Sequence, residues 1–228
     1  TYNDPVVFAE YAIDTAKACR QKGVKTVAVT AGYMYPEPAK EFYAVMDAAN
    51  VDLKAFTDEF YIKRCGGHLQ PVLDTLAYIH HETDCWLEIT TLLIPGHNDS
   101  PTEIQALSQW VLSELGPDVP LHFSAFHPDH RMRHIPATPS RTLSRARTIA
   151  MEAGIRYVYT GNVYDPEGGT TFCPTCATPV IRRDRYVIDS YALDDHGCCT
   201  VCGTRIPGRF NAHSGSGRRR MPHRITIH

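Results

Sequence analysis

The sequence predicts an α/β fold with a parallel sheet, followed by a small metal-binding module. Short β-branched runs alternate with helical patterns along most of the chain, which is the rhythm of repeated βα units. Two Cys-x-x-Cys pairs follow, at a spacing typical of metal ligands. The composition, with 43% hydrophobic and 21% charged residues, is that of an ordinary globular protein.

Charge and hydropathy exclude several classes of protein. The formal net charge of −2 argues against a nucleic-acid-binding role for the body of the chain. No apolar run approaches the ~18 residues that a membrane span needs. Thiols paired for a metal indicate a reducing compartment. We therefore expect a cytosolic protein with neither a membrane nor a nucleic-acid partner.

Five apolar stretches have the length and β-branched content of buried strands. They begin near residues 24, 50, 85, 120 and 154. The stretches are VKTVAVTAG, NVDLKAF, CWLEITTLLIPG, PLHFSAFHP and GIRYVYTGN. Repeating βα units of this length imply a parallel sheet, either a barrel or a doubly wound sheet. The chain has no G-x-G-x-x-G or Walker loop, so the nucleotide-binding versions of the open sheet lose support.

Two helices carry start and stop signals. Ser100 has the position of an N-cap, Glu103 completes a capping box, and Gly116 follows the last turn. Thr138 and Gly154 repeat this arrangement at the two ends of the next helix.

Polar residues stand at three of the strand ends, where the working residues of a barrel gather. Asp52 and Lys54 fall on one side of a strand, and a buried Lys needs a partner. This couple indicates a charged ligand, or else a surface ion pair at the sheet rim. His127 alone favours a structural role over that of a ligand-binding residue. Asn98 and Asp99 favour a turn that leads into a helix.

Several motifs occur in an order that resembles the AmmeMemoRadiSam-system radical SAM enzymes, which are relatives of the pyruvate formate-lyase and other glycyl-radical activating enzymes. The likeness runs from residue 1 to about residue 210. The motifs are TYNDP, VTAGY, ANVDLKAFTDEFY, WLEITTLLIPGHNDS, FHPDH and TGNVYDPEG.

The resemblance implies a partial (β/α)6 TIM-like barrel. In that family a 4Fe-4S cluster, held by a C-x-x-x-C-x-x-C loop, cleaves S-adenosylmethionine (SAM) to a 5′-deoxyadenosyl radical that abstracts hydrogen from a substrate. An electron donor and an unidentified protein or small-molecule substrate are the partners that this implies.

The resemblance also assigns SAM contacts. Asn3 and Asp4 match the segment that meets the methionyl amino group, where the family usually has Glu in place of Asp4. Asp52 and Lys54 match a second segment that reaches SAM, with Lys54 suited to the carboxylate. His127 matches a His that approaches the adenosine portion.

The cluster motif itself does not occur in these 228 residues, because Cys19, Cys65 and Cys85 are isolated from one another. We therefore expect a chain truncated at its N-terminus, missing the first strands and the cluster loop. The alternative is a degenerate relative without a cluster. In either case this chain alone should be inactive in SAM cleavage.

The four cysteines of the two Cys-x-x-Cys pairs predict a zinc-ribbon or rubredoxin-like site. Four thiolates suit a tetrahedral Zn or Fe and leave no open position for a substrate, so a structural clamp is the first interpretation and an electron-transfer iron site the second. Cys198 is not expected to be a ligand, although it could replace its neighbour Cys199 in that role. The predicted ligands are Cys173, Cys176, Cys199 and Cys202.

These patterns divide the chain into a barrel portion at 1–162, a four-cysteine metal ribbon at 163–210 and a disordered basic tail at 211–228. Two other functions fit parts of the sequence. One is a binding module in which the ribbon and the Arg-rich tail engage nucleic acid or a protein partner. The other is a barrel lyase or aldolase with Lys54 as a Schiff-base nucleophile, which leaves the ribbon unexplained.

Overall fold

The computed structural model describes residues 3–184 and 187–210. The chain forms two compact units, Thr1–Gly168 and Gly169–His228. The expected basic tail at 211–228 lies outside the described residues. In the described part, no helix is long and apolar enough to cross a membrane.

The first unit is built on a five-stranded parallel sheet, which confirms the predicted parallel α/β fold. The strands pair in the order of the chain, so that each strand lies beside the next one in sequence. They are β1 (Val27–Thr30), β2 (Ala48–Asp52), β3 (Trp86–Leu93), β4 (Leu121–Ala125) and β5 (Val158–Gly161).

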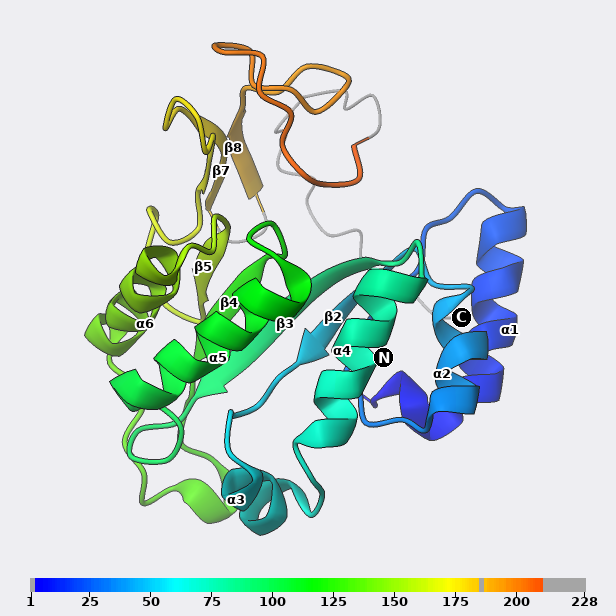
Figure 1. The fold of residues 1–228 in the computed structure, drawn as a ribbon, viewed down its shortest axis with the longest axis vertical. Coiled ribbons are helices and arrows are strands. Elements are labelled where there is room, and N and C mark those ends of the chain that lie inside the picture. The colour runs from blue at the N-terminus through cyan, green and yellow to red at the C-terminus, as the bar shows by residue number, and fades with distance from the viewer. Residues whose placement is uncertain (1–2, 185–186, 211–228) are drawn as a thin grey trace, which may run out of the picture. The chain divides into compact units, whose positions relative to one another are not determined.

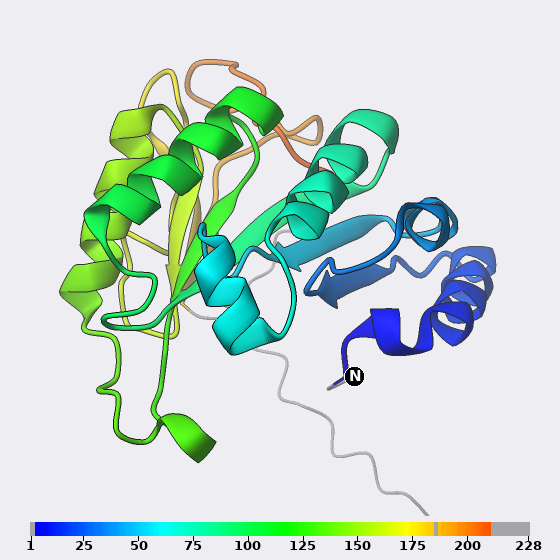
Figure 2. The ribbon, with the colours of Figure 1, turned by 60° about the horizontal axis from the view of Figure 1, so that its bottom comes forward.

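Helices precede β1 and connect the strands. They are η1 (Pro5–Phe8), α1 (Ala9–Gln21), α2 (Pro36–Tyr43), α3 (Asp58–Phe60), the π-helix η2 (Tyr61–Cys65), α4 (Gln70–Glu82), α5 (Pro101–Leu115), η3 (His130–Met132) and α6 (Ser140–Ala153). Helices α2, α4, α5 and α6 cover one face of the sheet (Figures 1 and 2). Sequential parallel strands joined by right-handed crossovers place their helices on one side, as in the wall of a barrel.

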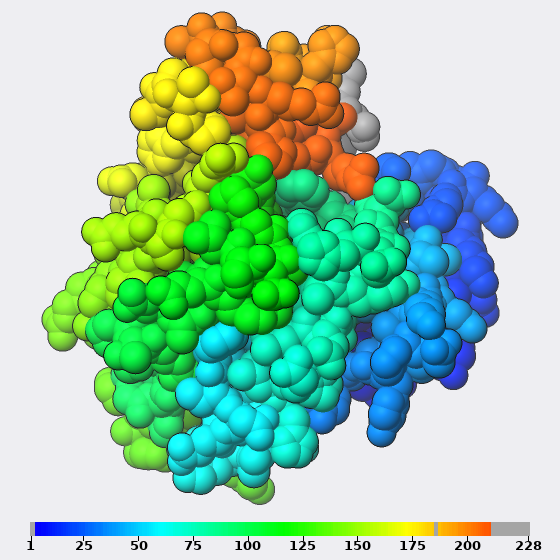
Figure 3. Space-filling view, viewed as in Figure 1, coloured from blue at the N-terminus to red at the C-terminus, as the bar shows by residue number. Residues whose placement is uncertain are grey.

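The two faces of the sheet differ in burial. Residues that face the helices are buried, such as Val51 and Ile89, whose exposed fraction is 0%. In the space-filling view, the side chains of α4 and α5 meet over this face (Figure 3). On the other face Val29 is 64% exposed, and its in-register neighbour Asn50 is half-buried. The hydrophobic core of this unit therefore lies between the sheet and the helices.

Helix α5 begins as predicted, with Ser100 Oγ accepting a hydrogen bond from the Glu103 N–H at 3.2 Å. The Glu103 side chain, which was predicted to complete the capping box, makes a different contact. Glu103 Oε1 accepts a hydrogen bond from the Phe56 N–H at 2.8 Å, so this carboxylate joins α5 to the segment after β2.

The prediction that Thr138 caps α6 is wrong, because the N-cap is Pro139. Thr138 is buried, and its hydroxyl donates to Leu93 O at 2.6 Å while accepting from the Phe126 N–H at 3.0 Å. Its hydroxyl therefore joins the ends of β3 and β4. The predicted end of the helix is confirmed at Gly154, which has a φ of 117°.

The second unit contains a three-stranded antiparallel sheet ordered β6-β7-β8. Its few buried apolar side chains include Val180, Leu193 and Ile206. A core of this size gives little stability by itself, so a further cross-link is expected. The strands are β6 (Thr171–Phe172), β7 (Pro179–Asp184) and β8 (Val187–Tyr191).

Candidate functional site

Asp4 joins the start of the described chain to the end of β1. Its Oδ1 accepts hydrogen bonds from the Val6 N–H at 3.1 Å and the Thr30 hydroxyl at 2.7 Å, and its Oδ2 accepts one from the Ala31 N–H at 2.7 Å. Asn3, directly before it, is exposed. An ionised carboxylate has about four acceptor positions, so Asp4 retains capacity for one more donor.

Asp52 and Lys54 form an ion pair at the carboxyl end of β2. Lys54 Nζ lies 2.8 Å from Asp52 Oδ2, and their side chains are 39% and 36% exposed. The Lys54 N–H donates to Tyr61 Oη at 3.0 Å, which fixes the backbone of this segment against η2. Burial raises the pKa of Tyr61, which keeps its hydroxyl neutral. Both charged groups are therefore held on a fixed backbone and stay open to solvent.

Asn98 fixes the same backbone from the other side. Its side chain is buried, with Nδ2 donating to Lys54 O at 2.6 Å and to Leu92 O at 2.9 Å. Its Oδ1 accepts from the Ile94 N–H at 2.7 Å. The sequence indicated a turn at Asn98, and the structure adds that this side chain connects the ends of β2 and β3.

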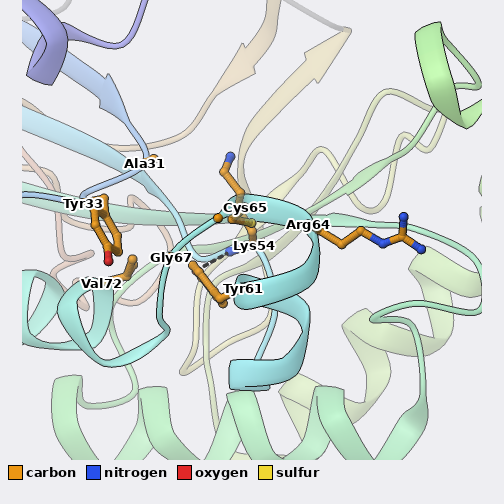
Figure 4. A pocket seen from close by; sticks show the side chains of 9 residues that line it. Ala31, Tyr33, Lys54, Tyr61, Arg64, Cys65, Gly67 and Val72 are labelled. Carbon is orange, nitrogen blue, oxygen red and sulfur yellow. Dashed lines mark hydrogen bonds between the residues drawn. The ribbon is translucent and has the colours of Figure 1, made fainter.

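A cavity of about 370 Å³ opens beside Lys54 (Figure 4). Tyr33 and Val72 lie on one side of it, and the Arg64 side chain extends to the opposite side. Gly67 approaches the Tyr33 ring so closely that a Cβ there would lie 3.0 Å from ring carbons. The lining residues are Ala31, Tyr33, Lys54, Tyr61, Arg64, Cys65, Gly66, Gly67 and Val72.

The other residues predicted to contact SAM lie on separate segments of the first unit. Asp4 is bonded to the end of β1, the strand beside β2. His127 lies two residues beyond β4 in an exposed loop, and it does not line the cavity described above. Asp52 and Lys54 are thus in direct contact, while Asp4 and His127 stand at the carboxyl ends of other strands.

A row of polar residues lies on the face of the sheet that the helices do not cover, and the sequence did not predict it. The strand register aligns Asp52, Thr90, His122 and Tyr159 across β2 to β5. His122 Nε2 lies 2.8 Å from Glu88 Oε2, and its ring stacks on Tyr159 with centroids 4.9 Å apart. This row runs from the carboxyl end of β2 at Asp52 to the amino-terminal parts of β4 and β5 at His122 and Tyr159.

Alternation of residue type could have revealed that row. In β3, the polar Glu88 and Thr90 alternate with the apolar Leu87 and Ile89. Side chains at every second position of a strand share a face, so this pattern marks one face as polar. Asn50 belongs to the same face, since its Oδ1 accepts a hydrogen bond from the Thr90 hydroxyl at 2.8 Å.

In the second unit, the four predicted cysteine ligands come together. Sγ of Cys173 and Cys202 lie 3.5 Å apart, Sγ of Cys176 and Cys199 lie 3.7 Å apart, and all four sulfurs fall within 4.8 Å of one another. A tetrahedron with Zn–S bonds of about 2.3 Å has S···S edges of about 3.8 Å. The four thiols therefore fit a tetrahedral metal ion.

Threonine side chains support two of these sulfurs. Thr178 Oγ lies 3.2 Å from Cys176 Sγ and lowers the pKa of this thiol to about 6. Thr204 Oγ lies 3.3 Å from Cys202 Sγ and lowers its pKa as well. Burial instead raises the pKa of Cys173 to about 11, so a bound cation is needed for this thiolate to form near neutral pH.

The two Cys-x-x-Cys loops have the same backbone conformation. In the first, the Ala177 N–H donates to Cys173 O at 2.9 Å, and in the second the Gly203 N–H donates to Cys199 O at 2.8 Å. Both turn residues are left-handed, with φ of 57° at Ala177 and 73° at Gly203. Ala in this conformation is strained, whereas Gly is not.

We predict that Ala177→Gly and Gly203→Ala change the stability of the second unit in opposite directions. Ala177→Gly should stabilise it by up to about 1 kcal/mol, and Gly203→Ala should destabilise it by about 1 kcal/mol. A Cβ at Gly203 meets no atom within 4 Å, so only backbone strain is tested there. The temperature of metal release, followed with a chromogenic chelator, measures both. Shifts of the same sign would contradict the shared conformation.

Two solved structures are similar in fold to most of this chain. A crystal structure of a domain of pyruvate-formate lyase-activating enzyme from Bacteroides vulgatus matches with a TM-score of 0.62 at 18% identity, covering 71% of this chain and 96% of that domain. A radical SAM methyltransferase from Sphaerobacter thermophilus matches with a TM-score of 0.55 at 14% identity, covering 69% of this chain and 48% of the other. Most of the chain therefore shares its fold with these two proteins.

In sequence, the chain is 39% identical over 207 residues to the uncharacterized protein MJ0808 of Methanocaldococcus jannaschii. That match covers 90% of this chain and 61% of the relative, so the chain spans less than two thirds of the relative's length. No protein-family model matches the chain.

Proposed function

We propose that the first unit is part of a radical SAM enzyme with a partial (β/α)6 barrel of the AmmeMemoRadiSam type. The observation that carries this proposal is the open Asp52–Lys54 ion pair at the carboxyl end of a parallel sheet whose helices lie on one face. The fold shared with radical SAM proteins supports it.

In this proposal, SAM and a 4Fe-4S cluster held by cysteines outside these residues supply a 5′-deoxyadenosyl radical for hydrogen abstraction. Lys54 binds the methionyl carboxylate, since its ammonium is partly exposed and held on a fixed backbone. Asp4 and Asp52 offer carboxylate oxygens to the methionyl ammonium, with Asn3 beside them. His127 meets the adenosine portion from the loop after β4.

The second unit serves as a structural clamp in the proposal. Its four thiols have the closed donor set of structural zinc, and a closed set leaves no position for a substrate. The same donors accept iron, which would make the ribbon an electron-transfer site. Metal analysis of the purified protein distinguishes a structural zinc site from an electron-transfer iron site.

The whole enzyme is longer than this chain in our proposal, in keeping with the 61% of MJ0808 that the match covers. It works in the cytosol with an electron donor and a protein or small-molecule substrate. Sequencing of the gene upstream of the Thr1 codon tests whether the enzyme is longer than this chain, since a C-x-x-x-C-x-x-C loop should be encoded there.

We predict that Lys54→Met lowers SAM cleavage roughly 10- to 100-fold, the effect of losing one charge-assisted hydrogen bond. The assay uses the full gene product after anaerobic cluster reconstitution, with dithionite as reductant and 5′-deoxyadenosine as the measured product. Lys25→Met is the matched control, because Lys25 also pairs with an aspartate, Asp47, at 2.8 Å, but at the amino end of the sheet.

The control should keep the activity of the unmodified protein. Equal losses in the two variants would show a general effect of charge or stability, not a role for Lys54 in SAM binding. If the cluster-loaded protein releases no 5′-deoxyadenosine at all, the proposed function is wrong.

A further inference from the structure

Four polar side chains on the face of the sheet that the helices do not cover have no role in the function proposed above. They come from three neighbouring strands, Asn50 from β2, Glu88 from β3, and His122 and Ser124 from β4. Asn50 and Glu88 are register partners, and Glu88 Oε2 lies 2.8 Å from His122 Nε2. Ser124 follows His122 by two positions, so both side chains lie on the same side of β4. We call these four residues the His122 patch.

The His122 ring is held in one orientation and remains partly exposed. Its Nε2 contacts Glu88 Oε2, while Glu88 Oε1 accepts a hydrogen bond from Trp86 Nε1 at 3.1 Å. The ring also stacks on Tyr159, with an angle of 25° between the two ring planes. A carboxylate only accepts hydrogen bonds, so Nε2 carries the proton of the neutral ring and Nδ1 is an acceptor. The His122 side chain is 28% exposed, so this fixed acceptor is open to a ligand.

Asn50 and Ser124 add hydrogen-bond donors next to this acceptor. Asn50 Oδ1 accepts from the Thr90 hydroxyl at 2.8 Å, which leaves the Nδ2 amide hydrogens for another partner. The Ser124 hydroxyl makes no hydrogen bond to any residue that the structure describes. A Cβ at Gly161, the register partner of Ser124 on β5, would lie 2.8 Å from Ser124 Oγ. Glycine at this position therefore keeps space open beside the hydroxyl.

A hydroxyl group complements the His122 patch better than a charged group does. Because a hydroxyl both donates and accepts, it can pair with the His122 acceptor and also with the donors of Asn50 and Ser124. An anion would be repelled by the Glu88 carboxylate. A cationic amine has no acceptor to offer the Asn50 amide. The donors and acceptors of the patch therefore favour a neutral, hydroxylated ligand.

Aromatic rings adjoin the patch. The Trp86 indole is bonded to Glu88, as described above, and the Tyr159 ring stacks on His122. Both rings are half-buried, so each keeps apolar surface that can contact the C–H groups of a ligand. Hydroxyl groups on a framework of C–H groups are the chemistry of sugars and polyols.

We propose that the His122 patch binds a neutral, polyhydroxylated small molecule of the sugar or polyol class. His122 Nδ1 accepts a hydrogen bond from one ligand hydroxyl, and the Asn50 amide and the Ser124 hydroxyl bond the same or adjacent ligand oxygens. Glu88 is a positioning residue that fixes the imidazole. That this molecule is the substrate rests on the proposed function, whereas the binding site itself does not.

The test is saturation-transfer-difference NMR of D-glucose with this chain, without SAM or a cluster. His122→Phe keeps an aromatic ring against Tyr159 and removes the acceptor, so it should weaken glucose binding about tenfold. Ser124→Ala should weaken it roughly threefold or more, through the loss of one hydrogen bond. His81→Phe is the matched control, because His81 also makes one hydrogen bond, to Glu114 O at 2.8 Å, but lies on α4. The control should bind glucose as the unmodified chain does.

Circular dichroism checks that each variant is folded. Ser124→Ala breaks no hydrogen bond between the residues that the structure describes, so it keeps the test decisive if His122→Phe does not fold. If D-glucose does not bind at millimolar concentration, or if Ser124→Ala binds it as well as the unmodified chain, the proposal is wrong and the contact between Glu88 and His122 is only structural. Tighter binding of D-glucosamine than of D-glucose would overturn the neutral ligand class in favour of a cationic amine.

The readout is independent of radical chemistry. Glucose binding by this chain without release of 5′-deoxyadenosine by the full gene product would reject only the proposed function. Release of 5′-deoxyadenosine without glucose binding would reject only the sugar site.

Discussion

Cys199→Ser is expected to abolish metal binding by the second unit and to unfold it, whereas Cys198→Ser leaves both intact. Cys199 is 2% exposed and belongs to the four-sulfur group, while the adjacent Cys198 does not. Structural zinc contributes about 10–16 kcal/mol of binding free energy in zinc-finger peptides, and the buried apolar core here is small. Loss of one ligand therefore removes most of the stability of this unit.

Metal content per chain, measured by mass spectrometry, and limited proteolysis after Gly169 give the two readouts. The unmodified protein and Cys198→Ser should hold one metal ion and resist cleavage. If Cys199→Ser keeps a full equivalent of metal, Cys198 has replaced it as a ligand. If both variants lose the metal, the distinction between the two cysteines is wrong.

The second large effect is expected for Asn98→Ala, which should destabilise the first unit by about 3 kcal/mol. The change removes three hydrogen bonds of a buried side chain and leaves the Ile94 N–H and the Lys54 and Leu92 carbonyls without this partner. Buried polar groups that lose their partner cost more than the mean value of a hydrogen bond.

Urea unfolding followed by tryptophan fluorescence measures this loss in the first unit alone, because both tryptophans, Trp86 and Trp110, belong to it. Asn50→Ala is the control, since Asn50 is half-buried and accepts one hydrogen bond from Thr90. Its expected cost is about 1 kcal/mol. Similar costs for the two variants would contradict the special position of Asn98 between β2 and β3.

Features that depend on neighbouring residues could be predicted from the sequence. The βα alternation, the cap at Ser100, the stop at Gly154 and the two Cys-x-x-Cys loops each depend on a few adjacent positions. Period-two and period-3.6 patterns, turn residues and ligand spacing are local properties of a chain. The prediction of a parallel α/β fold with a separate four-cysteine group followed from these signals.

Only the tertiary structure decided the contacts that form the site. Asn98 bonds a backbone carbonyl 44 residues earlier, and Thr138 bonds one 45 residues earlier, so neither partner could be read from local pattern. The same holds for Arg64 and His97, which meet across 33 residues. Parallel strands bring distant loops to one edge of the sheet, and the side chains that meet there depend on strand order and register, which sequence periodicity does not specify.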